Sequence, residues 1–515
     1  MSTRRTAAWL TGGALAIAGA AAVPRTWQAA ATPSVSAWLN GAAEAMGGEA
    51  SLRSLTAVET SGITVWYHRE QSERPEGPWL LTVTDFTDVR HFGADTVLRT
   101  SRARGFSTND WVDSRDWTAA ASLLVTSGLA VGGAGSAGTA TGTPPDLEAL
   151  PVGLAPERLV LAARDAADGR AEADEWLDGS PHHVVGFTVD GARVRLFLQA
   201  ATLLPKAVEI TRPHPYDLAL APWGDVTQRV TFGMWTLEPS GLRYPRLWSY
   251  TTGGAPDGST SVTRVRVNPP APDAAPTSSA AGRLAHRPRI ADLPFGLAGQ
   301  TPRIVGPGIV VVPGRFGVVE VRQDDGVVIV DAPLSSEYSA RAIADARARF
   351  GSAPVKAVIT TSDAWPHIGG IREYVARGIP IFALDVNIPI LTRLIAAPYR
   401  SWPDALAARP REPDFRPVMG PTTLGTGETR LEMHPFRTAT GERQMMIYWP
   451  TQRLLYSSDL FTLRDDFVFL PQQVSEAVAA VAREHLDVVS AFGMHYGVTP
   501  WAAVVAAAAP PGSPR

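Results

Sequence analysis

The chain has no cysteine among its 515 residues, and charged residues are scarce. The absence of cysteine excludes disulfide bonds, thiolate metal ligands and a cysteine nucleophile, so any bound metal would need His, Asp or Glu ligands. Charged residues make up 19% of the sequence, and the formal net charge is −3. Because nucleic-acid binding needs a basic surface, we expect no nucleic-acid partner.

The N-terminal apolar segment is too short to cross a bilayer. Residues 9–23 supply about 15 residues, whereas a membrane-spanning helix needs about 20. The segment follows Arg4 and Arg5 and precedes three alanines at 29–31, an order typical of a cleaved signal peptide. We therefore predict a signal peptide over residues 1–31, no stable membrane span, and a periplasmic or secreted protein. The paired arginines also suit twin-arginine export.

A length of 515 residues exceeds what one hydrophobic core supports, so we expect more than one domain. Residues 33–267 open with helical spacing over 35–56 and then alternate as strands do. Residues 184–198 predict two strands joined at Asp190-Gly191, a strong hairpin signal. We predict a mainly antiparallel β domain of the α+β class here. Five aromatic residues are expected in its core and rim: Trp223, Trp235, Tyr244, Trp248 and Tyr250.

This order of an opening helix followed by hairpins resembles the curved half-barrel of LolA-like lipoprotein carriers. The resemblance implies a concave face that holds a lipid or a peptide. Residues 268–300, which are rich in Pro and Ala, predict a linker after this domain.

Residues 301–508 change to alternating strands and helices. Residues 327–330 read as a buried strand, 335–350 as a helix and 355–361 as the next strand. We expect an α/β domain built as an αββα sandwich, with helices covering the outer faces of two packed sheets. The G-x-G-x-x-G sequence that favours a dinucleotide-binding sheet does not follow the first strand.

The segment from Val358 to Gly370 reads V-I-T-T-S-D-A-W-P-H-I-G-G. It resembles the metal-binding loop of the metallo-β-lactamase superfamily, T-H-x-H-x-D-H-x-G-G. On that pattern, Ser362, Ala364 and Pro366 replace two histidines and an aspartate, and His367 alone is retained.

Other sequence blocks of the family also appear in order. Asp331 ends the strand at 327–330, and the resemblance implies that it bonds loop backbone near the metal. Asp459 and His495 match ligands of two later blocks.

The block between 433 and 442 lacks its usual histidine. Arg437 or Thr440 stands in that place, and His434, the only imidazole of the block, lies early. The family's three-histidine position therefore has no residue left in register.

The resemblance implies a single metal ion, zinc or iron, bound by His367, Asp459 and His495. Asp363 is expected as a fourth ligand or a general base, and Asp363 and Asp459 as the catalytic carboxylates. Two imidazoles and one carboxylate meet the minimum for catalytic zinc. The implied activity is hydrolysis of an ester, lactone or amide bond in a small-molecule substrate.

Each of these residues also has a structural interpretation. His367 could cap a helix, Asp459 could bond loop backbone, and Asp363 could be a helix N-cap or form an Asx turn. Arg437 could neutralise Asp459 in place of a metal. The alternative hypothesis is then a non-catalytic envelope protein with a degenerate site, whose β domain holds a lipid or a peptide.

Overall fold

A computed structural model describes residues 34–68, 80–106, 119–126, 152–270, 288–436, 443–458, 460, 462–464, 467–469 and 471–508. The predicted signal peptide and residues 271–287 of the predicted linker lie outside the described residues. No helix in the described ranges is long and apolar enough to span a bilayer.

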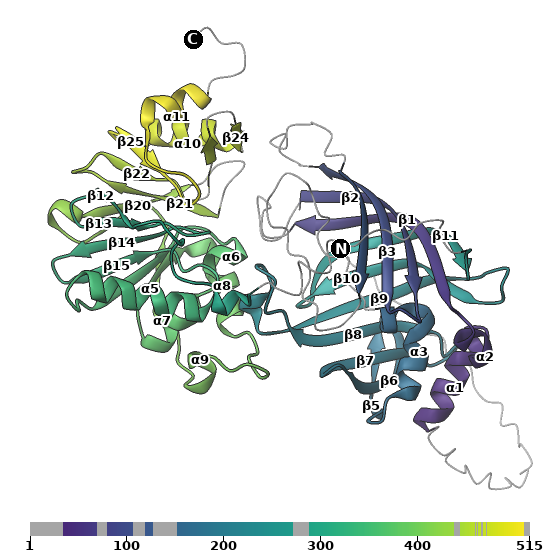
Figure 1. Ribbon diagram of the computed structural model, residues 1–515. Coiled ribbons are helices and arrows are strands. Elements are labelled where there is room, and N and C mark those ends of the chain that lie inside the picture. Colours follow the sequence, from purple (N-terminus) through teal and green to yellow (C-terminus); the bar gives the residue numbers. More distant parts are fainter. Residues whose placement is uncertain are drawn as a thin grey trace, which may run out of the picture.

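One antiparallel sheet of eleven described strands lies between residues 57 and 267 (Figure 1). Its order is β4-β3-β2-β1-β11-β10-β9-β8-β7-β6-β5, so two meanders meet where β1 pairs with β11. The predicted hairpin is confirmed, because Asp190 and Gly191 join β6 to β7 with positive φ values of 47° and 79°. The strands are β1 (Ala57–His68), β2 (Leu80–His91), β3 (Thr96–Phe106), β4 (Ala119–Thr126), β5 (Arg170–Leu177), β6 (Ser180–Val189), β7 (Ala192–Gln199), β8 (Pro205–Pro213), β9 (Asp225–Leu237), β10 (Arg243–Thr252) and β11 (Ala255–Val267).

Three helices pack against this sheet: α1 (Val35–Ala45), α2 (Glu49–Arg53) and α3 (Pro156–Asp165). The Ser34 hydroxyl accepts a hydrogen bond from the Ala37 amide at 3.2 Å and so caps α1. The prediction of one helix over 35–56 is wrong. Gly47 and Gly48 separate α1 from α2 with φ values of 120° and 93°, which a helix cannot contain.

Two further sheets lie between residues 303 and 500. The first has the order β12-β13-β14-β15-β16-β17-β18, in which β15, β16, β17 and β18 run parallel. Its strands are β12 (Arg303–Gly306), β13 (Ile309–Val312), β14 (Val318–Gln323), β15 (Gly326–Val330), β16 (Val355–Thr360), β17 (Ile381–Leu384) and β18 (Phe415–Val418). The second has the order β19 (Thr422–Leu424), β20 (Leu431–Phe436), β21 (Gln444–Trp449), β22 (Leu454–Tyr456), β25 (Ser490–Phe492) and β26 (Thr499–Pro500). A separate pair is β23 (Thr462–Arg464) with β24 (Phe467–Phe469).

These two sheets pack face to face between two layers of helices (Figure 1). Side chains of a strand alternate between its two faces, so β15 contributes to two cores. Val328 and Val330 face Ile447 and other residues of the second sheet, whereas Val327 and Ile329 pack against the helices on the outer side. The helices are α5 (Ser336–Arg349), α6 (Trp365–Ile368), α7 (Ile371–Arg377), α8 (Ile388–Ile395) and α9 (Ala405–Ala408) beside the first sheet, and α10 (Pro471–Arg483) and α11 (Trp501–Ala508) beside the second. The broad prediction of antiparallel sheets with a few helices is confirmed.

Candidate functional site

A buried carboxylate connects the C-terminal ends of three strands. Asp331 follows β15, and its Oδ1 accepts hydrogen bonds from the Thr361 amide and hydroxyl, both at 2.8 Å. Its Oδ2 accepts from the Tyr456 hydroxyl at 2.6 Å. Burial raises the pKa of Asp331 to about 6, although these donors act in the opposite direction. The prediction that Asp331 bonds loop backbone is confirmed.

Two imidazoles meet next to this anchored loop. His367, in α6, is 3% exposed, and His495, in the turn after β25, is exposed. Their ring centres are 5.6 Å apart, and the ring of Phe316 lies 5.1 Å from the first and 5.3 Å from the second. Burial, aided by the neighbouring His495, holds the pKa of His367 well below its usual value, so this imidazole is uncharged at neutral pH.

Asp363 lies in the same loop as His367 and faces a guanidinium. It is 1% exposed, and its Oδ2 is 3.0 Å from Nη1 of Arg443, which is 8% exposed. The Asn387 amide holds Arg443 from the other side by donating to its carbonyl oxygen at 2.6 Å. The alternative interpretation of the sequence placed Arg437 opposite Asp459 and did not include Arg443. Its position just after the block that lacks a histidine was the available signal.

Three of the remaining predicted residues lie outside the described residues: Asp459, Arg437 and Thr440. The residue before Asp459 is described: the Ser458 and Thr361 hydroxyl oxygens are 2.7 Å apart, within hydrogen-bond distance, and the Ser458 carbonyl accepts from the Met494 amide at 3.0 Å. The loops after β16, β22 and β25 are therefore hydrogen-bonded neighbours.

His434 lies away from this site. It is on β20, where its Nε2 is 3.4 Å from Glu432 and its Nδ1 is 3.7 Å from Glu484, the residue after α10. These contacts place it on the helix-covered side of the second sheet.

The geometry of the two imidazoles fits a shared metal ion. Zn–N bonds of about 2.0–2.1 Å and a near-tetrahedral angle place the ring centres of two ligands roughly 5–6 Å apart. The separation of 5.6 Å between His367 and His495 lies in this range. Among the residues that the structure describes, no group of three or more His, Asp or Glu side chains is arranged to hold a metal. A catalytic zinc site needs three protein ligands, and Asp459, the third predicted ligand, lies outside the described residues.

A segment of the N-terminal region packs against the loop and helix that carry His367. Trp223 packs edge-on against Trp365, two residues before His367, with ring centres 4.9 Å apart. A Cβ atom on Gly369 would lie 2.7 Å from the Pro222 ring, so glycine permits this close approach. The expectation that Trp223 belongs to the core or rim of the β domain is wrong, because it packs with the helix-covered core of the first C-terminal sheet.

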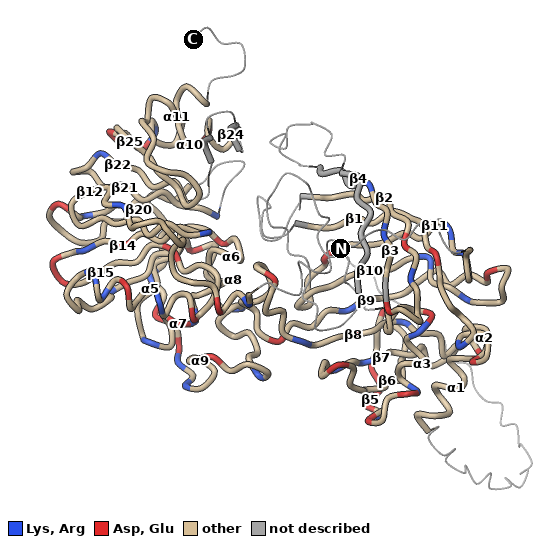
Figure 2. Tube along the Cα trace, viewed as in Figure 1, with Lys and Arg blue, Asp and Glu red and all other residues tan. Residues whose placement is uncertain are grey.

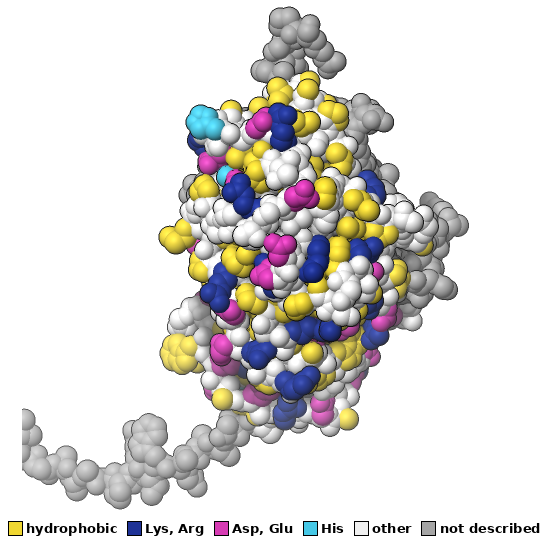
Figure 3. Space-filling view, turned by 90° about the vertical axis from the view of Figure 1, so that its left-hand side faces the viewer, with side chains coloured by type: hydrophobic (Ala, Val, Ile, Leu, Met, Phe, Trp, Pro, Cys, Tyr) yellow, Lys and Arg dark blue, Asp and Glu magenta, His cyan; other side chains and the backbone are white. Residues whose placement is uncertain are grey.

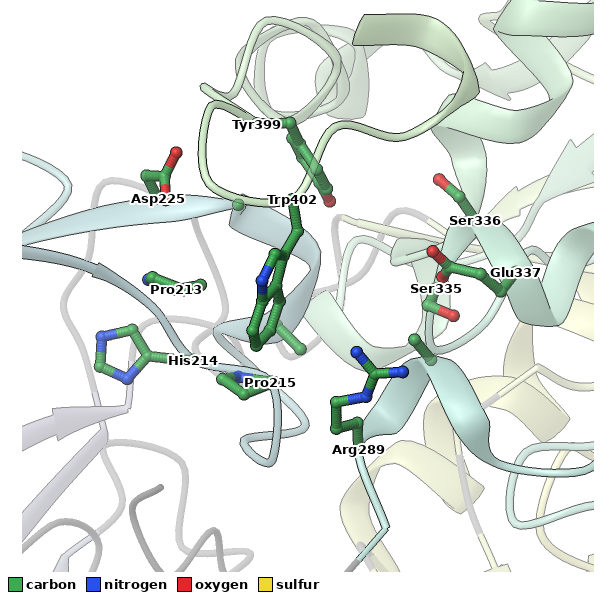
Figure 4. Close-up of a pocket in the computed structure, with 13 residues that line it drawn as sticks. Pro213, His214, Pro215, Asp225, Arg289, Ser335, Ser336, Glu337, Tyr399 and Trp402 are labelled. Atoms are coloured by element: carbon green, nitrogen blue, oxygen red, sulfur yellow. The ribbon is translucent and has the colours of Figure 1, made fainter. Parts of the chain in front are cut away.

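Hydrogen bonds also connect this N-terminal segment to residues 399–401 of the C-terminal region. The carboxylate of Asp225 accepts from the amides of Arg400 and Ser401 at 2.7 and 3.0 Å, and the Tyr399 hydroxyl donates to the Pro222 carbonyl at 2.5 Å. Figure 4 shows the rings of Tyr399 and Trp402 between Asp225 on one side and Ser335 and Glu337 on the other. A small cavity of about 70 Å³ remains in this interface.

Neither a family model nor a curated protein matches the sequence. Among solved structures, the chain is similar to a metallo-beta-lactamase from Pontibacter korlensis, with 14% identity and a TM-score of 0.31 over 40% of this chain and 96% of that one. Metallo-beta-lactamases from Hirschia baltica (16%, 0.30, 40% and 95%) and Erythrobacter litoralis (14%, 0.32, 40% and 93%) are similar to it in the same measures. TM-scores near 0.3 are low, so the layers described above rest on the contacts of this chain alone.

Proposed function

We propose that residues 301–508 form a metallo-β-lactamase-like domain in which His367, His495 and Asp459 bind one zinc or iron ion. On this proposal the protein is a metal-dependent hydrolase of an ester, lactone or amide bond. The observation that carries it is the pairing of two imidazoles from loops far apart in sequence, with ring centres 5.6 Å apart. The donor set is oxygen and nitrogen only, as the absence of cysteine requires.

A bound ion would polarise a carbonyl oxygen and lower the pKa of a water molecule. The chain's own residues prepare the position. Asp331 fixes the start of the loop through Thr361, and the Phe316 ring packs against both imidazoles and limits their rotation. The ion pair with Arg443 orients Asp363, which we retain as a fourth ligand or a general base.

Metal content and activity test the proposal together. Full-length protein purified without chelator should contain about one equivalent of zinc or iron and hydrolyse members of a panel of chromogenic esters and lactones. Replacing His367 and His495 together with alanine should remove both the metal and the activity. His91→Ala, a histidine of the N-terminal sheet, is the control and should change neither. A wild-type metal content below about 0.2 equivalents would sink the proposal.

A second candidate is favoured by the ion pair between Asp363 and Arg443. A buried carboxylate neutralised by a guanidinium is also what a metal-free site would contain. In a non-catalytic envelope protein, Arg443→Gln should lower the free energy of unfolding by about 3 kcal/mol or more, because it leaves a buried charge unpaired. The loss would be equal with and without EDTA, whereas a metal-bound site would become more sensitive to EDTA in this variant.

The remaining proposals concern location and the N-terminal region. We propose that residues 1–31 direct export to the periplasm or the medium, and that residues 33–267 form a LolA-like domain that holds a lipid or a peptide. Fusing residues 1–31 to a reporter that is active only after export tests the first proposal. A reporter that stays inactive and uncleaved would contradict it.

A further inference from the structure

Four arginines line an open groove on the C-terminal region. The groove has a volume of about 710 Å³, and the described residues that line it include Arg347, Arg377, Arg409 and Arg411 but no Asp or Glu. This concentration of one sign is unusual for a chain with 47 basic and 50 acidic residues. On the face shown in Figure 3, dark-blue and magenta side chains are interspersed.

The groove lies at the ends of the strands opposite to those that lead into the His367 loop. It is lined by Val355, where β16 begins, whereas Thr361 and the loop to His367 follow the other end of that strand. Ile379, just before β17, also lines it. The arginines come from the last turns of α5 and α7 and from the segment after α9 (Figure 2). The groove is therefore separate from the proposed metal site.

Acidic side chains of the described residues neutralise only part of this positive charge. Arg377 pairs with Glu373 at 2.6 Å. Within the described ranges, the exposed guanidinium groups of Arg347, Arg409 and Arg411 form no ion pair. Three like charges that share a groove repel one another, and a bound anion would offset that repulsion.

The ends of two helices do not account for four cations. Arg347 and Arg377 lie in the last turns of α5 and α7, where a cation suits the helix macrodipole. Arg411 also lies against the end of α7, because a Cβ atom on Gly378, which has a φ of 69°, would be 2.0 Å from its Nη1. Each helix end carries only roughly −0.5 charge. Two ends and Glu373 thus leave an excess of positive charge.

We propose that this groove binds a multivalent oxyanion, with a phosphate group as the best match. Guanidinium groups present paired N–H donors that fit phosphate oxygens, and they stay charged at every physiological pH. The apolar floor, which includes Ile343 and Ile379, suits a phosphate attached to an apolar or sugar moiety. A free phosphate ester and a phospholipid headgroup share this chemistry.

Calorimetric titration of the full chain with pyrophosphate tests the proposal, and flotation with vesicles containing phosphatidic acid or only phosphatidylcholine distinguishes the two sources. Wild-type protein should bind pyrophosphate or the anionic vesicles, and the binding should weaken with salt. Replacing Arg409 and Arg411 with glutamine should lower the affinity about tenfold or more, as expected for two charge-assisted contacts at the surface.

The matched control removes two exposed arginines outside the groove, Arg243→Gln with Arg393→Gln, and so causes the same change in net charge. It should bind as the wild type does. Equal losses in the two double variants would reduce the effect to net charge and overturn the proposal, as would wild-type protein that binds neither probe. Binding of vesicles without pyrophosphate binding, abolished only in the groove variant, would identify a lipid headgroup as the ligand.

Discussion

At the scale of single residues, the buried polar groups of this protein differ in how far hydrogen bonds and neighbouring charges offset the cost of their burial. Asp331 is buried but receives three hydrogen bonds from Thr361 and Tyr456. His214 is 5% exposed and has Arg212 as a neighbouring charge. Burial is the main cause that lowers the pKa of His214 to about 3, and Arg212 adds to it.

The His214 pKa predicts how stability depends on pH. The folded pKa of about 3 lies below the usual 6.5, so the unfolded chain binds more protons between these values. The stabilisation is complete above pH 6.5 and is lost as the pH falls towards 3. Between pH 6.5 and 4 the loss should be about 3 kcal/mol.

Denaturant titrations at several pH values check this prediction. His214→Gln removes the titrating group, so its free energy of unfolding should fall less steeply with acid than that of the wild type. The remaining titratable groups titrate in both proteins and cancel in the comparison. Parallel curves would show that His214 does not contribute to the acid sensitivity.

At the scale of elements, short loops at strand ends do most of the positioning. The loops after β15, β16, β22 and β25 are hydrogen-bonded to one another through Asp331, Ser458 and Met494. The segment 398–402 is held in a similar way, because Asp225 at the start of β9 accepts from two of its amides and donates its own amide to Pro398 at 2.6 Å. One carboxylate thus orders a segment about 175 residues away in sequence.

Asp225→Ala should release the 398–402 segment. Loss of two buried acceptor contacts should lower the free energy of unfolding by about 1–3 kcal/mol and speed hydrogen exchange at Arg400 and Ser401. Asp168→Ala is the control, since Asp168 accepts from the Thr188 amide and hydroxyl in the N-terminal sheet. Exchange at 400 and 401 that is unchanged in Asp225→Ala, or equally raised in Asp168→Ala, would contradict this role.

At the scale of the whole molecule, the N-terminal sheet and the C-terminal sandwich share a hydrophobic cluster. Leu218, Ala221 and Trp223, from the connection between β8 and β9, pack with the core between the first C-terminal sheet and its helices. The stability of the C-terminal core therefore depends on residues that belong to the N-terminal half.

Trp223→Ala should destabilise the C-terminal core although the substituted residue lies in the N-terminal half. Removing its packing on Trp365 should cost about 2–3 kcal/mol, visible as faster hydrogen exchange in β16 and β17. Trp176→Ala is the matched control, because Trp176 is 72% exposed and its loss should cost less than about 0.5 kcal/mol. If exchange in β16 is unaffected by Trp223→Ala, the two halves are energetically independent.

Local sequence patterns were sufficient to predict many elements. The continuous apolar run at 327–330 predicted a strand buried on both faces, and Asp190-Gly191 predicted a hairpin, because both signals act over a few residues. The predicted helix at 335–350 corresponds to α5. Breaks between helices were harder to predict from the sequence. The boundary at Gly47–Gly48 depends on φ values that the apolar spacing of 35–56 does not reveal.

The sequence alone determined the periodicities, the turn at 190–191 and the absence of thiolate chemistry, because each depends on residue identity or on neighbours along the chain. Tertiary structure decided which residues meet across long separations. It paired Arg443 with Asp363 and Trp223 with Trp365, and it brought His367 and His495 to ring centres 5.6 Å apart. Such contacts are set by strand order and by the packing of two sheets, which bring together residues whose local sequences carry no information about one another.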